Sequence, residues 1–313
     1  MDETSPPPVV VAVGGDGVGR AALAFAVDEA VRAGCGVHLL HVAPAFVHGP
    51  DSILVTSPEV QERGRRVLNE ALEVARQVVP SGTTLTSDLG VGPVVESLRE
   101  ATRGARMVVV EHRDLSRVHR LVSRSVTNGL GAHLRVPVVG VPAAWRPGRG
   151  PGQEPRVTVG VDVPVRSERV LRTAVAEAAG RGASLHALHA WRLTGMYDGG
   201  VSTQEQVQDL AQRAADEIRH ALGIAGVDAL DVEATVETRR GSPAEALVEA
   251  SGASDLLVVG RHDPLVPLGS HLGPVARGVL HEARCPVLLV DPHDPPGTDE
   301  ADGGDHRRGR VET

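Results

Sequence analysis

The sequence predicts an α/β fold made of two doubly wound domains in tandem, each with a parallel sheet covered by helices on both faces. Three observations predict it: the chain repeats itself once, apolar strand-like runs alternate with amphipathic helices in both copies, and a Pro/Gly-rich segment separates the copies. The length of 313 residues agrees, since about 150 residues per domain is usual. Antiparallel sandwiches are excluded, because their strands follow one another without intervening helices.

The internal repeat has the length of a domain. The run Val9-Val10-Val11-Ala12-Val13 aligns with Val157-Thr158-Val159-Gly160-Val161, and Arg135-Val136-Pro137-Val138 aligns with Arg284-Cys285-Pro286-Val287. Two copies of one domain are the economical explanation, and we expect a pseudo-two-fold relation between them. The predicted organisation is a disordered N-terminus at 1–8, a first domain at 9–143, a linker at 144–155, a second domain at 156–291 and a disordered tail at 292–313.

The elements of the first copy follow from its apolar spacing. Val9–Val13 is a short β-branched run, as in a buried strand, and residues 21–33 have helical spacing and stop at Gly34. A long amphipathic helix is predicted at 57–78, with Ser57 as its cap residue and Pro58 in its first turn. The other predicted elements are strands at 37–42, 85–89, 107–110 and 138–141, and helices at 94–101 and near 125–133.

The second copy repeats this order of elements. Its predicted strands lie near 157–161, 184–190, 231–237, 255–259 and 287–290. The last strand of each copy is short and apolar, and an apolar strand left at the open edge of a sheet promotes aggregation. Each of these two edges therefore needs a partner.

Composition excludes several classes of function. The net charge is −8 and all 32 basic residues are arginine, so Schiff-base chemistry on lysine and a phosphate-loop lysine are excluded. The acidic balance and an aromatic content of 2% argue against nucleic-acid binding. No run of roughly 18 apolar residues could span a membrane, and the acidic, Pro-rich start lacks the features of a signal peptide. We therefore expect a cytoplasmic protein with no nucleic-acid or membrane partner.

Several patterns that could carry chemistry are better explained by structure. The segment at 14–19 lacks the glycine spacing of a dinucleotide-binding turn and is interpreted as a flexible turn. His41 and His189 share a strand-end position, where a structural hydrogen bond is favoured over a place in a cleft. Cys35 and Cys285 should be packed thiols, and no metal site is expected because no set of ligands converges. No nucleophile elbow occurs, so no catalytic residue is predicted.

In doubly wound sheets, ligands bind beyond the carboxyl ends of the strands, where the strand order reverses. In the second copy, Gly260-Arg261-His262-Asp263 follows the fourth strand, and nine residues later Gly273-Pro274 opens a helix. Together with Val159-Gly160-Val161-Asp162 and Leu188-His189-Ala190-Trp191, this arrangement resembles a tandem universal stress protein over about 9–142 and 156–291. The resemblance implies an adenine nucleotide alpha-hydrolase-like fold for each domain. It also implies that the two last strands pair with each other and make an internal dimer.

The resemblance further implies a candidate site for ATP or another adenine nucleotide in the second domain. Nucleotide-binding members carry Gly, two residues, Gly, nine residues and then Gly-Ser or Gly-Thr, and Gly260 and Gly273 keep this spacing. Asp162 stands where members contact the adenosine part, with Val161 beside it. The departures are Asp263, which would place a carboxylate near bound phosphate, and Pro274, which removes one N–H donor while suiting a first helical turn.

The matching positions of the first domain depart further from the family pattern. They hold Glu111, Asp114, Arg124 and Ser125, so that Ser125 is the candidate binding residue there. Acidic side chains at two of these positions would oppose a phosphate in the same way as Asp263. We therefore expect the second domain to keep half of the nucleotide site and the first domain to keep less of it.

The resemblance implies a non-enzymatic protein of stress response or signalling, with weak adenine-nucleotide binding in the second domain. Two alternatives stay open: a nucleotide-hydrolysing or nucleotide-transferring enzyme that uses the same cleft, and an interaction module without a ligand. The absence of lysine and of a nucleophile elbow weighs against an enzyme. A homodimer of whole chains is also compatible with the sequence.

Overall fold

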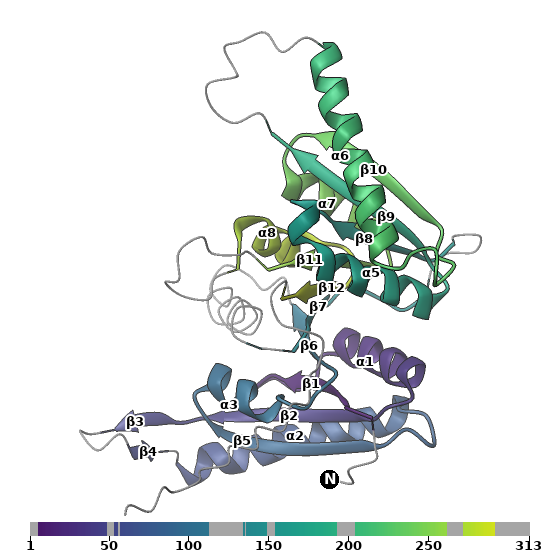
Figure 1. Ribbon diagram of the computed structural model, residues 1–313. Coiled ribbons are helices and arrows are strands. Elements are labelled where there is room, and N and C mark those ends of the chain that lie inside the picture. Colours follow the sequence, from purple (N-terminus) through teal and green to yellow (C-terminus); the bar gives the residue numbers. More distant parts are fainter. Residues whose placement is uncertain are drawn as a thin grey trace, which may run out of the picture.

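The computed structural model describes residues 6–48, 53–55, 57–112, 134, 136–148, 154–192, 204–261 and 272–291. The helix predicted near 125–133, the candidate Ser125, residues 1–5 and the predicted tail at 292–313 lie outside this part of the chain. The described residues form two similar α/β halves that share one ten-stranded sheet (Figure 1). The predicted fold class is confirmed.

The first half alternates strands and helices in the predicted order. Helix α1 ends where Gly34 adopts a left-handed backbone (φ 63°), and α2 begins at Pro58 after Ser57, whose hydroxyl oxygen accepts a hydrogen bond from the Val60 amide at 3.3 Å. One short hairpin, β3–β4, was not predicted. The elements are β1 (Val9–Val13), α1 (Arg20–Ala33), β2 (Val37–Pro44), β3 (Phe46–His48), β4 (Ile53–Val55), α2 (Pro58–Val78), β5 (Leu85–Gly92), α3 (Val94–Ala101), β6 (Met107–His112) and β7 (Val138–Pro142).

The second half follows the same pattern. The strand predicted at 231–237 is found at Ala234–Arg240, because the backbone is still turning at Asp231 (φ 51°) and pairing with the preceding strand starts at Ala234↔Leu185. The elements are β8 (Arg156–Gly160), the 3-10 turn η1 (Pro164–Arg166), α5 (Glu168–Arg181), β9 (Ser184–Trp191), α6 (Gln204–Ile224), β10 (Ala234–Arg240), α7 (Pro243–Ser251), β11 (Leu256–Gly260), α8 (Pro274–Glu282) and β12 (Val287–Val290).

The strand order of the sheet shows how the halves are related. The order is β10-β9-β8-β11-β12-β7-β6-β1-β2-β5. Leaving out the β3–β4 hairpin, each half has its strands, from the outer edge inward, in the order third, second, first, fourth and last along the chain. Within each half, all strand pairs of this sheet are parallel, whereas β12 and β7 pair antiparallel, with Leu288 opposite Val139. An antiparallel joint between two copies of one parallel order is what a pseudo-two-fold axis produces. The implied pairing of the last strands is confirmed.

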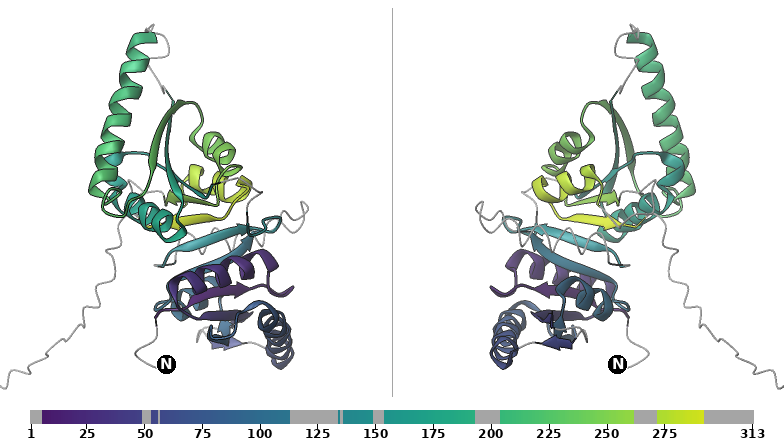
Figure 2. Two further views of the ribbon diagram at one scale, coloured as in Figure 1. Left: turned by 90° about the vertical axis from the view of Figure 1, so that its right-hand side faces the viewer. Right: turned by 90° about the vertical axis from the view of Figure 1, so that its left-hand side faces the viewer.

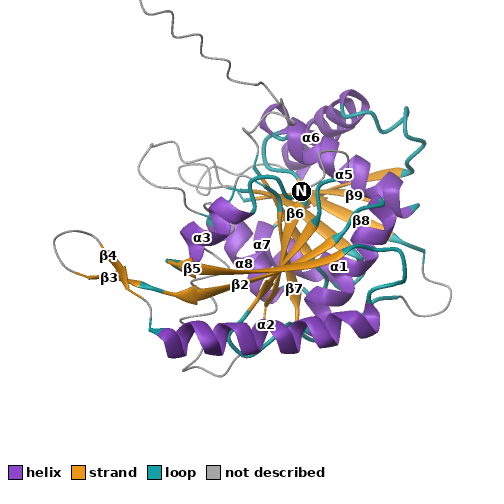
Figure 3. Ribbon diagram, turned by 90° about the horizontal axis from the view of Figure 1, so that it is seen from below, coloured by secondary structure: helices purple, strands orange, loops and turns teal. Residues whose placement is uncertain are grey.

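The helices cover both faces of the sheet. Figure 2 shows the long α6 on one face of the second half, with the two shorter helices α7 and α8 on the other. In the view from below, α2 lies alongside β2 and β5, at the lower edge of the picture (Figure 3). The β3–β4 hairpin projects beyond the end of β2. The strand ends at the reversal of strand order are therefore framed by helices from both layers.

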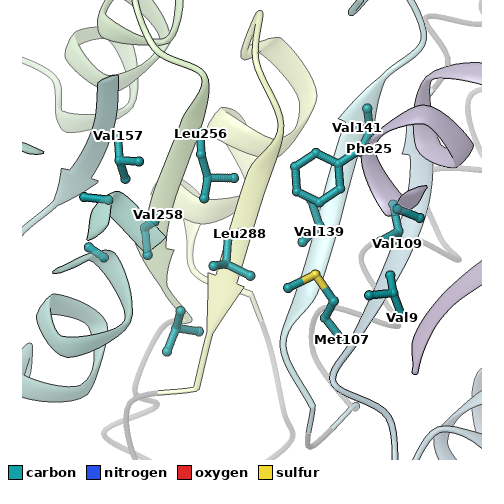
Figure 4. Close-up of a cluster of buried hydrophobic side chains, with 14 of the residues drawn as sticks. Val9, Phe25, Met107, Val109, Val139, Val141, Val157, Leu256, Val258 and Leu288 are labelled. Atoms are coloured by element: carbon teal, nitrogen blue, oxygen red, sulfur yellow. The ribbon is translucent and has the colours of Figure 1, made fainter. Parts of the chain in front are cut away.

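Two apolar layers hold the halves together, one on each face of the sheet. Alternate residues of the strands point to opposite faces, so Val139 and Leu288 join one layer while Val138 and Leu289 join the other. Figure 4 shows the first layer continuing across the β12–β7 joint, from Val157 and Leu256 to Val9. The core is therefore continuous between the halves.

The joint has one close approach. A Cβ atom at Gly140 of β7 would overlap Cδ1 of Leu280, which projects from α8 of the other half and is 2% exposed. Glycine at this position lets a helix of the second half lie directly on a strand of the first. The contact therefore fixes how closely the two halves pack.

A buried ionic cluster joins the two halves on the other side of the sheet. Glu29 of α1 is 2% exposed, and its carboxylate contacts Arg181 of α5 at 2.9 Å, Arg32 at 2.5 Å and Arg106 at 3.5 Å. Arg181 also pairs with Glu177, which occupies in α5 the place that Glu29 occupies in α1. Burial raises the pKa of Glu177; the Arg181 guanidinium opposes this shift and the Glu29 carboxylate adds to it.

We expect the stability of Glu177→Gln to depend less on pH than that of the wild type. A raised pKa in the folded state means that folding disfavours the charged form, so wild-type stability should increase as pH falls through the folded pKa toward the unfolded value. The variant should lack this increase. Urea unfolding between pH 4 and 8 measures both curves, and parallel curves for the two proteins would contradict the prediction.

Candidate functional site

The candidate site is a cavity of about 440 Å³ at the carboxyl ends of β8 and β11, where the strand order of the second half reverses. Its lining comes from the ends of β8, β9 and β11, from η1, and from α5, α7 and α8. It is lined by Gly160, Val161, Asp162, Val163, Arg166, Ser167, Val170, Leu188, Ala190, Pro243, Leu247, Val259, Gly260, Arg261, Gly273, Pro274, Val275 and Ala276.

The structure brings the second-domain candidates together. Val161 and Asp162 follow β8, Gly260 is the last residue of β11, and Gly273 precedes α8; all four line the cavity. Val161 is buried and its amide donates to the carbonyl of Leu188 at 3.0 Å, whereas Asp162 is exposed. The first-domain candidate Ser125 and the departing residue Asp263 lie outside the described residues.

Two glycines at the strand ends leave space in the cavity. A Cβ at Gly260 would lie 3.2 Å from Cγ2 of Val170, and one at Gly160 would lie 3.0 Å from Cδ1 of Leu247. Both distances are tighter than ordinary van der Waals contact, so a larger side chain would have to displace a wall residue or enter the cavity. These positions therefore suit close approach of a ligand to the backbone.

Helix α8 presents its N-terminus to the cavity. Gly273 is its N-cap and makes no side-chain cap, and Pro274 occupies the first turn, as predicted from its fixed φ. Proline has no N–H, so the amides that follow in the first turn are those of Val275 and Ala276, and both residues line the cavity. Backbone amides at a helix N-terminus favour an anion.

The cationic side chains of the cavity differ in what they contact. Arg261 is 7% exposed; it donates to the carbonyl of Val136 at 3.1 Å and to that of Leu134, and it lies 3.6 Å from Asp291. Its guanidinium thus ties the site to the first half of the chain. Arg166 on η1 is exposed and belongs to the same lining as Asp162.

The matching end of the first half is arranged differently. Glu111, at the position of Gly260, accepts a hydrogen bond from the Ala21 amide at 3.0 Å in the first turn of α1. The Gly14–Gly17 segment closes on itself, since the Gly17 amide donates to the Gly14 carbonyl at 3.1 Å. The turn interpretation of this glycine-rich segment is therefore confirmed.

The predicted structural roles of the histidines and thiols are also confirmed. Nδ1 of His41 lies 2.8 Å from the carbonyl oxygen of Val13, and Nδ1 of His189 lies 2.9 Å from that of Val161, so both rings bridge neighbouring strand ends. Cys35 and Cys285 are buried, and burial raises the pKa of the Cys35 thiol. The raised pKa leaves less of the reactive thiolate form at Cys35.

Sequence reasoning missed most of the apolar wall. Leu188 and Ala190 could have been found, because alternate residues of a strand share a face and the segment was already part of the motif. Val170 and Leu247 belong to helices whose approach to the cavity depends on packing. No local pattern indicated them.

Two further features are absent from the described residues. Within these ranges, no group of three or more His, Cys, Asp or Glu side chains is placed to hold a metal ion. No helix in the same part of the chain is both long and apolar enough to cross a bilayer.

Comparisons with known proteins agree with this architecture. The model of the universal stress protein family matches twice, at residues 7–142 and 155–291. A universal stress protein of Mycolicibacterium smegmatis is 30% identical over 91% of this chain and 97% of the relative. Universal stress protein Rv1996 of Mycobacterium tuberculosis is 27% identical over 92% of this chain and 96% of the relative.

A solved structure supports the fold. The universal stress protein from Archaeoglobus fulgidus DSM 4304 superposes with a TM-score of 0.65, at 17% identity, over 90% of this chain and 96% of that one. The two family matches coincide with the two halves of the sheet. The chain therefore belongs to the universal stress protein family and carries two of its domains in tandem.

Proposed function

We propose that the second domain binds an adenine nucleotide in the cavity at the ends of β8 and β11, and that the chain acts by binding rather than by catalysis. The observation that carries the proposal is that Val161, Asp162, Gly260 and Gly273, which come from three separate segments of the sequence, all line one cavity. Its volume of about 440 Å³ falls within the range of small-molecule sites, roughly 300–1,000 Å³.

The lining suits the parts of a nucleotide. Val161, Leu188 and Leu247 offer an apolar surface to a base. The carboxylate of Asp162 is an acceptor for the amino or hydroxyl groups of the adenosine part. The amides of Val275 and Ala276 in the first turn of α8 favour a phosphate there, and Arg166 adds a positive charge to the lining. These features support one bound nucleotide with its phosphate at α8.

The non-enzymatic part of the proposal rests on what the cavity offers. The residues in its lining with ionisable side chains are Asp162, Arg166 and Arg261, and the guanidinium of Arg261 is held by main-chain carbonyls. No nucleophile–base pair stands in this lining. Incubation with ATP followed by chromatography tests it, and saturable turnover that depends on Asp162 or Arg166 would contradict it. The expected cytoplasmic location and homodimer stay predictions.

We expect Asp162→Asn to weaken nucleotide binding by about 10- to 100-fold, because hydrogen bonds to a charged acceptor contribute roughly 1.5–3 kcal/mol. Isothermal titration with ATP, ADP, AMP and cyclic AMP measures the affinities. Asp209→Asn is the matched control, since Asp209 is exposed on α6 and pairs with Arg213. If the wild-type protein binds none of the four nucleotides, the alternative of an interaction module without a ligand is favoured.

A further inference from the structure

Glu111 and Gly260 occupy the same place in the two halves of the chain. Glu111 pairs with Val141 in the β6–β7 ladder, and Gly260 pairs with Val290 in the β11–β12 ladder. The helices that follow the first strands, α1 and α5, also start at matching points and are both 14 residues long. The two cleft positions can therefore be compared within one molecule.

In the first half, the carboxylate of Glu111 lies against the first turn of α1. The Ala21 amide donates to its Oε2 at 3.0 Å, across 90 residues of sequence. A Cβ at Gly19, the N-cap of α1, would overlap the same carboxylate, which shows how closely the two segments approach. Because the N-cap offers no side-chain acceptor, Glu111 provides the anion that a helix N-terminus favours.

In the second half, the same place is open. Gly260 has no side chain, and both it and the start of α5 at Ser167 and Val170 line the cavity. The Ser167 hydroxyl donates to the carbonyl of Val163 at 2.8 Å. A glutamate at 260 would start 3.2 Å from Val170 at its Cβ, so its carboxylate would have to enter the cavity.

We propose that this one position decides which cleft can take a ligand. Glu111 acts as an internal anion that closes the first-domain cleft to external anions, and glycine at 260 leaves the second-domain cleft open. The chain then offers one anion-accepting site instead of two, with the first domain serving as its structural partner. The identity of the ligand as a nucleotide rests on the proposed function, whereas the closure by Glu111 does not.

The closure is tested without any nucleotide. Amide hydrogen exchange of Ala21, followed by NMR, should be at least about 10-fold faster in Glu111→Gly than in the wild type, because a net hydrogen bond to a charged group is lost. Glu111→Gln is the matched control, since its amide oxygen can still accept from Ala21. Equal exchange in Glu111→Gly and the wild type would overturn the proposal.

Inorganic phosphate then probes the opened cleft. It should raise the thermal midpoint of Glu111→Gly by several degrees more than that of the wild type or of Glu111→Gln, because only the glycine variant leaves the anion position at α1 vacant. An equal rise in all three proteins would overturn the proposal. A fold control is the far-ultraviolet circular dichroism of each variant before titration.

The second cleft is tested with ATP. The wild type should bind one ATP per chain, and Gly260→Glu should bind at least about 100-fold more weakly. Gly260→Gln separates the effect of filling the cavity from the effect of adding a negative charge, and it should bind ATP with intermediate affinity. Two ATP per wild-type chain, or wild-type affinity in Gly260→Glu, would overturn the proposal. No ATP bound to the wild type would overturn the proposed function, while the Ala21 exchange and phosphate results would still decide the closure.

Discussion

Replacement of Glu29 by glutamine is expected to lower the free energy of unfolding at pH 7 by about 3 kcal/mol. Removing one partner of a buried ionic cluster leaves the opposite charges uncompensated, which typically costs 3–5 kcal/mol. Here the carboxylate faces Arg32, Arg106 and Arg181, and Arg181 is only 9% exposed. Urea unfolding followed by circular dichroism measures the change.

The matched control for this prediction is Glu62→Gln. Glu62 pairs with Arg65 on the exposed side of α2, with 62% of its side chain accessible, and such surface pairs contribute roughly 0–1 kcal/mol. Because Arg181 comes from the other half of the chain, Glu29→Gln should also weaken the coupling of the halves, which appears as a lower m value or a second transition. Equal losses in the two variants would contradict the prediction.

Replacement of Gly140 by valine is expected to lower the free energy of unfolding by about 2–3 kcal/mol. The new side chain would overlap Leu280, which is buried between the halves, and inserting atoms into a packed core commonly costs 1–3 kcal/mol. Gly104→Ala is the control, since a Cβ at Gly104 meets nothing within 4 Å. Differential scanning calorimetry and urea unfolding measure both variants.

A double-mutant cycle identifies the contact responsible. Leu280→Ala alone should be destabilising because it leaves a cavity, but in the Gly140→Val background it should cost less, since the valine fills part of that cavity. A coupling energy near zero between the two positions would show that the loss in Gly140→Val has another origin.

Elements with strong local signals were predicted well. The strand at 287–290 and the helix at 94–101 were found at the predicted bounds, because short apolar runs and amphipathic spacing act within a few residues. The hairpin β3–β4 was missed because strands of three residues are too short for a periodic signal. The displaced strand β10 shows that the partner strand, and not local composition, sets the register.

Only those residues of the candidate site that belong to a sequence motif could be predicted. Asp162, Gly260 and Gly273 could be singled out by spacing, yet their meeting in one cavity depends on the strand order. Glu111 was expected to oppose a phosphate, but its hydrogen bond to Ala21 joins segments that no local pattern connects. The buried cluster at Glu29 could have been predicted from the sequence, because both copies have a glutamate at the same point of an otherwise apolar helix face.

The antiparallel joint between β7 and β12 limits how the chain can assemble further. Each half contributes its innermost strand to this joint, so backbone groups that could have recruited another molecule are already saturated inside one polypeptide. The sheet ends instead at β5 and β10. Self-association of whole chains through this sheet would therefore use β5 or β10, and its geometry would differ from the β7–β12 pairing within the chain.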